Sequence, residues 1–132
     1  MPKSIVAALQ IGALPGGKGE TLEQILSWED AISESGAALV VMPEALLGGY
    51  PKGEGFGTQL GYRLPEGREA YARYFANAID VPGAETEALA VLSARTGANL
   101  VIGVIVLLAY WKSGLFNKFG RVWVCWGSVW KA

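Results

Sequence analysis

Three short apolar runs separated by helical patterns constrain the fold of this 132-residue chain more than any other feature. Strands that are divided by helices pair in parallel, because parallel neighbours need a crossover connection. Apolar runs of this kind are typical of strands that are buried on both faces. The pattern therefore predicts an α/β fold in the order β-α-β-α-α-β. We expect strands at 4–11, 37–42 and 99–105, and helices at 21–35, 68–79 and 84–96.

The expected helix ends carry recognisable signals. Thr21 and Gln24 fit a capping box at the start of the first helix. Gly36 and Gly97 follow the first and third helices, where a glycine suits the left-handed C-terminal cap. Residues 45–67 form a stretch rich in glycine and proline, which predicts a long loop. Long loops in compact domains are often functional.

Composition excludes several classes of function. The chain is 52% hydrophobic and 17% charged, which indicates a globular protein rather than a disordered one. It has no histidine, so Ser-His and Cys-His catalysis and the commonest metal ligand are excluded. We expect no metal and no cofactor. A net charge of -1 gives no reason to expect a nucleic-acid partner.

Neither a leader peptide nor a membrane anchor is expected. Gln10 interrupts the apolar run near the amino terminus, which is therefore too short for a signal peptide. The longest apolar run, residues 100–111, is shorter than the roughly 20 residues of a membrane-spanning helix. The single cysteine, Cys125, cannot form an internal disulfide, which fits the reducing cytoplasm.

Glu44 is the candidate catalytic residue. It follows Pro43, which ends the strand predicted at 37–42 because proline has no N–H to donate. Ligands of open α/β sheets bind outside the carboxyl ends of the strands. A carboxylate at that edge can act as a general base, although a glutamate after a strand is more often a solvated loop residue or a helix cap.

The residues around Glu44 resemble a known family. The string from Gly36 to Glu44, followed by Leu47-Gly48-Gly49-Tyr50-Pro51, is similar to the first signature of the nitrilases, which belong to the carbon–nitrogen hydrolase superfamily. The resemblance covers residues 1–105. It implies the N-terminal portion of an α-β-β-α sandwich that is much longer than this chain. It also implies a nitrile or amide as the small-molecule substrate, and a homo-oligomer for the full-length protein.

The resemblance implies a Glu-Lys-Cys triad, in which Glu44 is the general base. The cysteine attacks the nitrile carbon, ammonia leaves, and a thioester is hydrolysed to the carboxylic acid. Neither Lys112 nor Lys118 matches the family's lysine segment. Cys125 lies in a Gly-x-Val…Cys-Trp string similar to the nucleophile strand, but the spacing is one residue short, and a packed hydrophobic cysteine is the commoner case. We therefore expect a truncated nitrilase that is inactive alone. The alternatives are an amidase-type hydrolase and a non-catalytic fragment.

The chain changes character near Ile105. Residues 1–105 hold all 12 acidic residues and 7 basic ones, so their net charge is 7 − 12 = −5. Residues 106–132 hold no acid, 4 basic residues and four of the five tryptophans. Val106 stands where the family usually has a glutamate. We therefore expect a family domain over 1–105 and a divergent aromatic, basic tail over 106–132, as a frameshift or a rearranged end would produce.

Three rival interpretations involve other segments. Residues 12–19 are a near match to the phosphate-binding P-loop, with Lys18 as the phosphate ligand, but Gly19 replaces the Ser or Thr that would hold Mg²⁺. The uncharged run 100–108 has high β-propensity and could drive association between chains. The tail mixes tryptophan with lysine, as membrane-surface segments do, although its glycines argue against that role.

Overall fold

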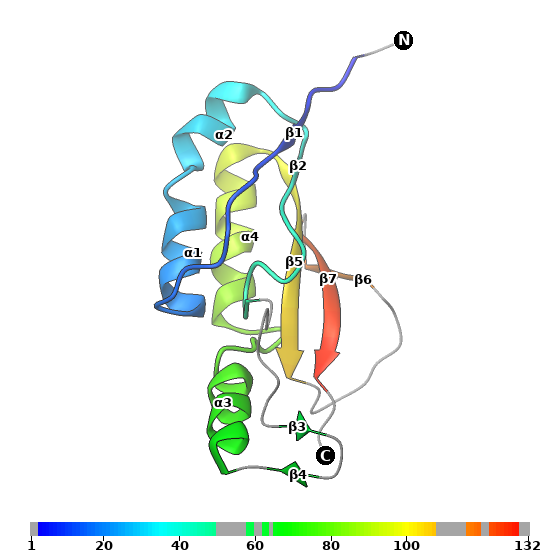
Figure 1. The fold of residues 1–132 in the computed structure, drawn as a ribbon. Coiled ribbons are helices and arrows are strands. Elements are labelled where there is room, and N and C mark those ends of the chain that lie inside the picture. Colours follow the sequence, from blue (N-terminus) through cyan, green and yellow to red (C-terminus); the bar gives the residue numbers. More distant parts are fainter. Residues whose placement is uncertain are drawn as a thin grey trace.

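A computed structural model describes residues 3–49 and 65–106 in full, and the backbone alone at 58–59, 62–63, 107, 116–119 and 122–129. Strands alternate with helices along the chain (Figure 1). The strands are β1 (Val6–Ala8), β2 (Leu39–Val41), β3 (Thr58–Gln59), β4 (Tyr62–Arg63), β5 (Asn99–Leu107), β6 (Phe116–Phe119) and β7 (Val122–Val129). The helices are α1 (Lys18–Leu26), α2 (Glu29–Ser35), α3 (Pro65–Ala76) and α4 (Ala84–Thr96).

The main sheet has the strand order β1-β2-β5-β7-β6. Strands β1, β2, β5 and β7 run parallel, and β6 is antiparallel to β7. Strands β3 and β4 form a separate antiparallel pair. The predicted α/β fold is thus confirmed, and parallel pairing brings the carboxyl ends of β1, β2 and β5 to one edge of the sheet.

Helices α1, α2 and α4 lie together on one face of the sheet (Figure 1). On that face the registered residues Ala7, Val40 and Leu100 point toward the helices, and Val40 and Leu100 are completely buried with Ile25 and Leu89. On the other face Val6 is 62% exposed and Val41 is 38% exposed. The described part of the chain therefore covers one face of its sheet with helices and leaves apolar residues of the other open.

Most predicted elements are present with shifted bounds. The helix predicted at 84–96 is α4, residue for residue, and the predicted strand at 99–105 continues to Leu107. Gly36 and Gly97 both have left-handed φ angles, 62° and 74°, and their predicted role as C-terminal caps is confirmed. The helix predicted at 68–79 starts at Pro65, because proline suits the first turn of a helix, where its missing N–H is not needed. Strands β1 and β2 are three residues each, shorter than predicted.

The helix predicted at 21–35 is wrong in two respects. It is two helices, α1 and α2, separated at Ser27 and Trp28. The Ser27 hydroxyl donates to the Gln24 carbonyl (2.7 Å) and the Trp28 N–H donates to the Ile25 carbonyl (3.2 Å), so the last turn of α1 tightens and stops. The predicted capping box at Thr21 is also wrong, because α1 begins at Lys18 and Gly17 is its N-cap.

Described elements lie within the predicted loop at 45–67 and across the predicted boundary at 105/106. Strands β3 and β4 and the first residues of α3 fall within 45–67, and much of that range lies outside the described residues. Strand β5 runs through the boundary without a break, and β7 pairs with it from Leu100↔Val122 to Leu107↔Val129. The backbone of part of the predicted tail thus continues the parallel sheet.

Candidate functional site

Glu44 lies in a turn that leaves β2 and returns to the same sheet. After β2, the Met42 N–H donates to the Val101 carbonyl (2.8 Å), and the Pro43 carbonyl accepts from the Gly103 N–H (3.2 Å). The chain then turns through residues 44–46, and Leu47 pairs in parallel with Val104 of β5. Both ends of the turn are therefore held by β5, at the sheet edge where the sequence placed the site.

The Glu44 side chain is exposed, whereas the three residues that follow it are buried. No hydrogen bond or ion pair joins its carboxylate to another residue in the described ranges 3–49 and 65–106. Ala45 has a left-handed φ of 51° and is 5% exposed, packed with Ala78 and Ile105. The turn, held to β5 at both ends, thus presents one exposed carboxylate at the edge of the sheet.

The glycines of the Leu47–Pro51 motif have a physical role in this turn. Gly48 and Gly49 have φ angles of 104° and 75°, which L side chains rarely adopt. A Cβ on Gly48 would lie 2.6 Å from Ile105 Cβ, so the chain passes β5 too closely for a side chain. Tyr50 and Pro51, which complete the motif, lie outside the described residues.

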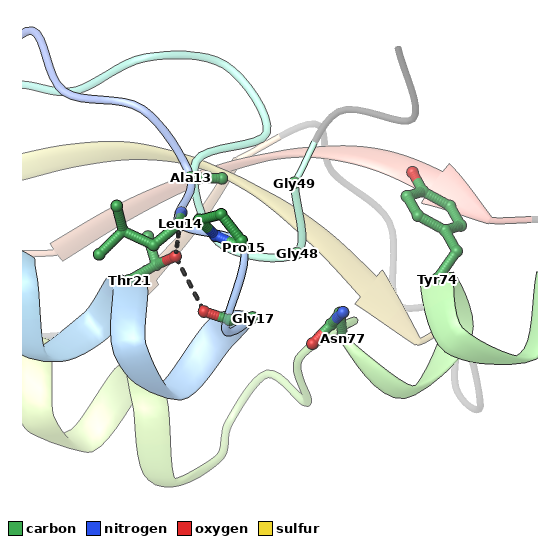
Figure 2. A pocket seen from close by; sticks show the side chains of 9 residues that line it. All are labelled: Ala13, Leu14, Pro15, Gly17, Thr21, Gly48, Gly49, Tyr74 and Asn77. Atoms are coloured by element: carbon green, nitrogen blue, oxygen red, sulfur yellow. Dashed lines mark hydrogen bonds between the residues drawn. The ribbon is translucent and has the colours of Figure 1, made fainter. Parts of the chain in front are cut away.

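A pocket of about 280 Å³ flanks the turn on the side of Gly48 and Gly49 (Figure 2). It lies between the β1–α1 loop and the end of α3. Its lining residues are Ala13, Leu14, Pro15, Gly17, Thr21, Gly48, Gly49, Tyr74 and Asn77, and Glu44 is not among them. Figure 2 shows the Thr21 hydroxyl accepting from the Leu14 N–H and donating to the Gly17 carbonyl, both at 2.9 Å. Thr21 thus shapes the wall of this pocket instead of capping a helix.

Polar groups of the glycine-rich loop at 12–19 already form hydrogen bonds and an ion pair with other groups of the protein. The Gly16 N–H donates to Glu20 Oε2 (2.7 Å) and the Gly17 N–H to the Leu14 carbonyl (3.1 Å). Lys18 Nζ donates to the Ala78 carbonyl (2.9 Å) and lies 3.2 Å from Glu85 Oε1. A phosphate site would need these amides and this ammonium to be free. The arrangement therefore favours a structural loop over the nucleotide-binding alternative.

The other sequence-predicted site residues are placed only in part. Strand β7 carries Cys125 in register with Gly103, the residue whose N–H holds the Glu44 turn. Lys118 lies in β6, in register with Trp123, and Lys112 lies outside the described residues. Gly103 is not among the site residues that the sequence predicts. The signal for it was a glycine inside the apolar run 99–105, since a glycine in a strand often marks a close backbone approach.

Two classes of feature are absent from the described residues. No group of three or more His, Cys, Asp or Glu side chains there could hold a metal ion. None of the four described helices is long and apolar enough to cross a membrane.

Comparison with known proteins identifies the family of the Glu44 motif. The model of the carbon–nitrogen hydrolase family matches residues 5–122, a longer range than the 1–105 over which the motifs show the resemblance. An aliphatic nitrilase from Sinorhizobium fredii is 37% identical over an alignment of 142 positions. The alignment covers 96% of this chain and 46% of the relative. A nitrilase from Bradyrhizobium diazoefficiens is 43% identical over 99 residues, 75% of this chain and 31% of the relative. Nitrilase 2 of Arabidopsis thaliana is 44% identical over 85 residues, 64% of this chain and 25% of the relative. The chain spans less than half the length of these relatives.

Proposed function

Because the chain belongs to the carbon–nitrogen hydrolase family, we propose that Glu44 is the general base of a nitrile-hydrolysing site to which this chain contributes the first part. One observation carries the proposal: a single exposed carboxylate stands on a buried turn whose two ends are both held by β5. The nitrilase relatives support a nitrile as the substrate. An amide is the close alternative, since the family's amidase-type members resemble the nitrilases in their triad.

The proposed reaction needs a nucleophile that Glu44 can activate. A cysteine thiolate adds to the nitrile carbon, water then adds, and ammonia leaves to give a thioester, which a second water hydrolyses to the carboxylic acid. Glu44 takes the proton from the thiol and later from water. The ordinary thiol pKa, about 8.5, makes such a base necessary near neutral pH.

The 132-residue chain alone is proposed to be inactive. No lysine in it matches the family's lysine, and loss of one member of a catalytic unit can cost nearly as much as loss of all. We also place the protein in the cytoplasm, from its single cysteine, and propose that the full-length form is a homo-oligomer, as the family resemblance implies.

The test is a fusion in which residues 1–105 replace the corresponding part of the Sinorhizobium fredii aliphatic nitrilase. Ammonia release from a panel of aliphatic and aromatic nitriles and amides is measured for the fusion and for the chain alone. Glu44→Gln keeps the side-chain size but cannot accept a proton, and we expect it to lower kcat of the fusion about 10²–10⁴-fold.

Glu34→Gln is the matched control, because Glu34 is exposed in α2 and should leave kcat unchanged. Unchanged turnover in Glu44→Gln would refute the assignment of the base. Multiple turnovers by the 132-residue chain that vanish in Cys125→Ala would refute its inactivity and make Cys125 the nucleophile. A fusion more active on amides than on nitriles would favour the amidase alternative.

A further inference from the structure

We infer that Gly103 is a positioning residue for Glu44. Because Gly103 has no side chain, the backbone of the Glu44 turn can lie directly against β5. The inference rests on the proposed role of Glu44 as the base. It concerns a residue that touches no substrate and acts only through the turn above it.

The contact between the turn and Gly103 is made by backbone atoms. A Cβ built on Gly103 would lie 2.5 Å from Glu44 Cα, 2.6 Å from the Ala45 nitrogen and 2.6 Å from the Pro43 carbonyl oxygen. Non-bonded carbon atoms are at their best separation at about 3.5–4.0 Å. No flexible side chain is available to move aside, so a methyl group here must displace the backbone of Glu44 itself.

The same glycine also anchors the turn through its own peptide groups. Its N–H donates to the Pro43 carbonyl (3.2 Å), and its carbonyl accepts from the Leu47 N–H (3.3 Å). Glu44 is therefore bracketed by two hydrogen bonds to one residue. The φ angle of Gly103 is not in the left-handed region, so alanine could adopt its backbone conformation and only the contact with the turn forbids it.

The far side of the turn cannot yield easily. Ala45 is 5% exposed and packs with Ala78 and Ile105, and the Ile105 N–H donates to the Leu47 carbonyl (2.8 Å). A turn pushed away from residue 103 must withdraw Ala45 from this cluster or lengthen its hydrogen bonds to β5. A displacement of about 1 Å at a reacting group can cost about 10²-fold in rate.

A double-mutant cycle in the fusion separates positioning from general damage. We expect Gly103→Ala to lower kcat per folded enzyme about 10²-fold when Glu44 is present, and less than about threefold when position 44 is glutamine. A merely structural role would lower kcat by the same factor in both backgrounds, and that result would overturn the inference. Gly12→Ala is the control. A Cβ on Gly12 meets no atom within 4 Å, so the kcat of the fusion that carries this change should stay the same.

Hydrogen exchange in the 132-residue chain tests the turn without catalysis. In Gly103→Ala we expect the amides of Leu47 and residue 103 to exchange about tenfold faster or more, whereas Met42, bonded to Val101 upstream, should keep its rate. Unchanged exchange at Leu47, or a variant that circular dichroism shows to be unfolded, would overturn the inference. If Glu44→Gln alone leaves turnover unchanged while Leu47 exchange accelerates, the proposed base is wrong and the contact with the turn stands.

Discussion

At the scale of single residues, Lys18 offers the clearest test of a part-buried polar contact. Its ammonium donates to the Ala78 carbonyl and pairs with Glu85, so it ties the start of α1 to the α3–α4 connection and to the first turn of α4. Lys18→Met keeps the aliphatic stem but leaves both acceptors without this donor. We expect the free energy of unfolding to fall by about 1–2 kcal/mol, since the pair is partly exposed and solvent weakens it. Urea denaturation measures the change.

Lys3→Met is the control for this measurement, because Lys3 is exposed near the amino terminus and its replacement should alter stability by less than about 0.5 kcal/mol. Equal stability of the two variants would show that the Lys18 contacts contribute nothing. Binding of a nucleoside triphosphate to the chain, lost in Lys18→Met, would instead revive the P-loop interpretation.

The predictability of single residues from sequence depends on how local their contacts are. Glu44 could be placed at a strand end because Pro43 and the apolar run before it are its immediate neighbours. Gly103 could not be assigned a role, because its contact with Glu44 joins residues far apart in the chain. Thr21 was assigned to the wrong contact for a different reason. Helix α1 begins at Lys18, earlier than predicted, so Thr21 lies inside it and its hydroxyl bonds to Leu14 and Gly17.

At the scale of elements, the glycine that ends α4 tests the conformational argument for helix caps. Gly97 has φ 74°, and a Cβ there would meet no atom within 4 Å, so Gly97→Ala isolates the strain of the left-handed conformation. We expect it to lower the free energy of unfolding by about 1–2 kcal/mol. Gly19 in α1 has equally open surroundings but no positive φ, and Gly19→Ala should raise stability by about 0.5–1 kcal/mol.

The urea midpoint, or the midpoint of the chevron plot, should therefore fall in Gly97→Ala and rise in Gly19→Ala. Two shifts of the same sign would mean that packing, rather than backbone conformation, decides the effect at one of the sites. Both variants should keep native circular dichroism.

Element bounds could be predicted where caps and periodicity agree. Helix α4 is bounded by Gly83 and Gly97, and both of its ends could be predicted from these glycines. The break between α1 and α2 could not be predicted, because Ser27 and Trp28 fit a continuous helix and only the Ser27–Gln24 hydrogen bond shows the interruption. Strands β1 and β2 are three residues each, although backbone hydrogen bonds continue past their ends, as from the Leu9 N–H to the Val41 carbonyl (2.9 Å).

At the scale of the whole molecule, the described helices cover one face of the sheet, and among the described residues the other face keeps exposed apolar side chains (Figure 1). Helices cover one side, whereas Val6 and Val41 on the other are exposed. The relatives are more than twice as long as this chain, as the 46% coverage of the aliphatic nitrilase shows. The α-β-β-α sandwich implied by the motifs would place a second sheet on this face. The sequence predicted the α/β class because strand and helix periodicities are local, whereas an uncovered face is a property of the assembled sheet.

Two observations bear on the proposed boundary between residues 105 and 106. The jump from a net charge of −5 to +4 and the clustered tryptophans favour a tail that is foreign to the body. The pairing of β7 with β5 and the family match up to residue 122 extend the sheet and the resemblance past the boundary. We keep the boundary as a proposal, because charge composition and backbone pairing give opposite expectations for the stability of this segment.

Limited trypsin digestion of the chain, followed by mass spectrometry, decides between these expectations. Lys118 lies in β6, an edge strand that pairs, among the described strands, with β7 alone, and edge strands open at low cost. We therefore expect cleavage at Lys112, Lys118 or Arg121 before Arg73 in α3 or Arg95 in α4, where Arg95 also contacts Glu29 at 3.3 Å. Arg95→Gln gives a control digest in which a body site is removed and the order of tail cleavage should not change. Equal protection of tail and body sites would contradict the boundary, because proteolysis tracks local opening and a tail that opens no more readily than α4 belongs to the folded sheet.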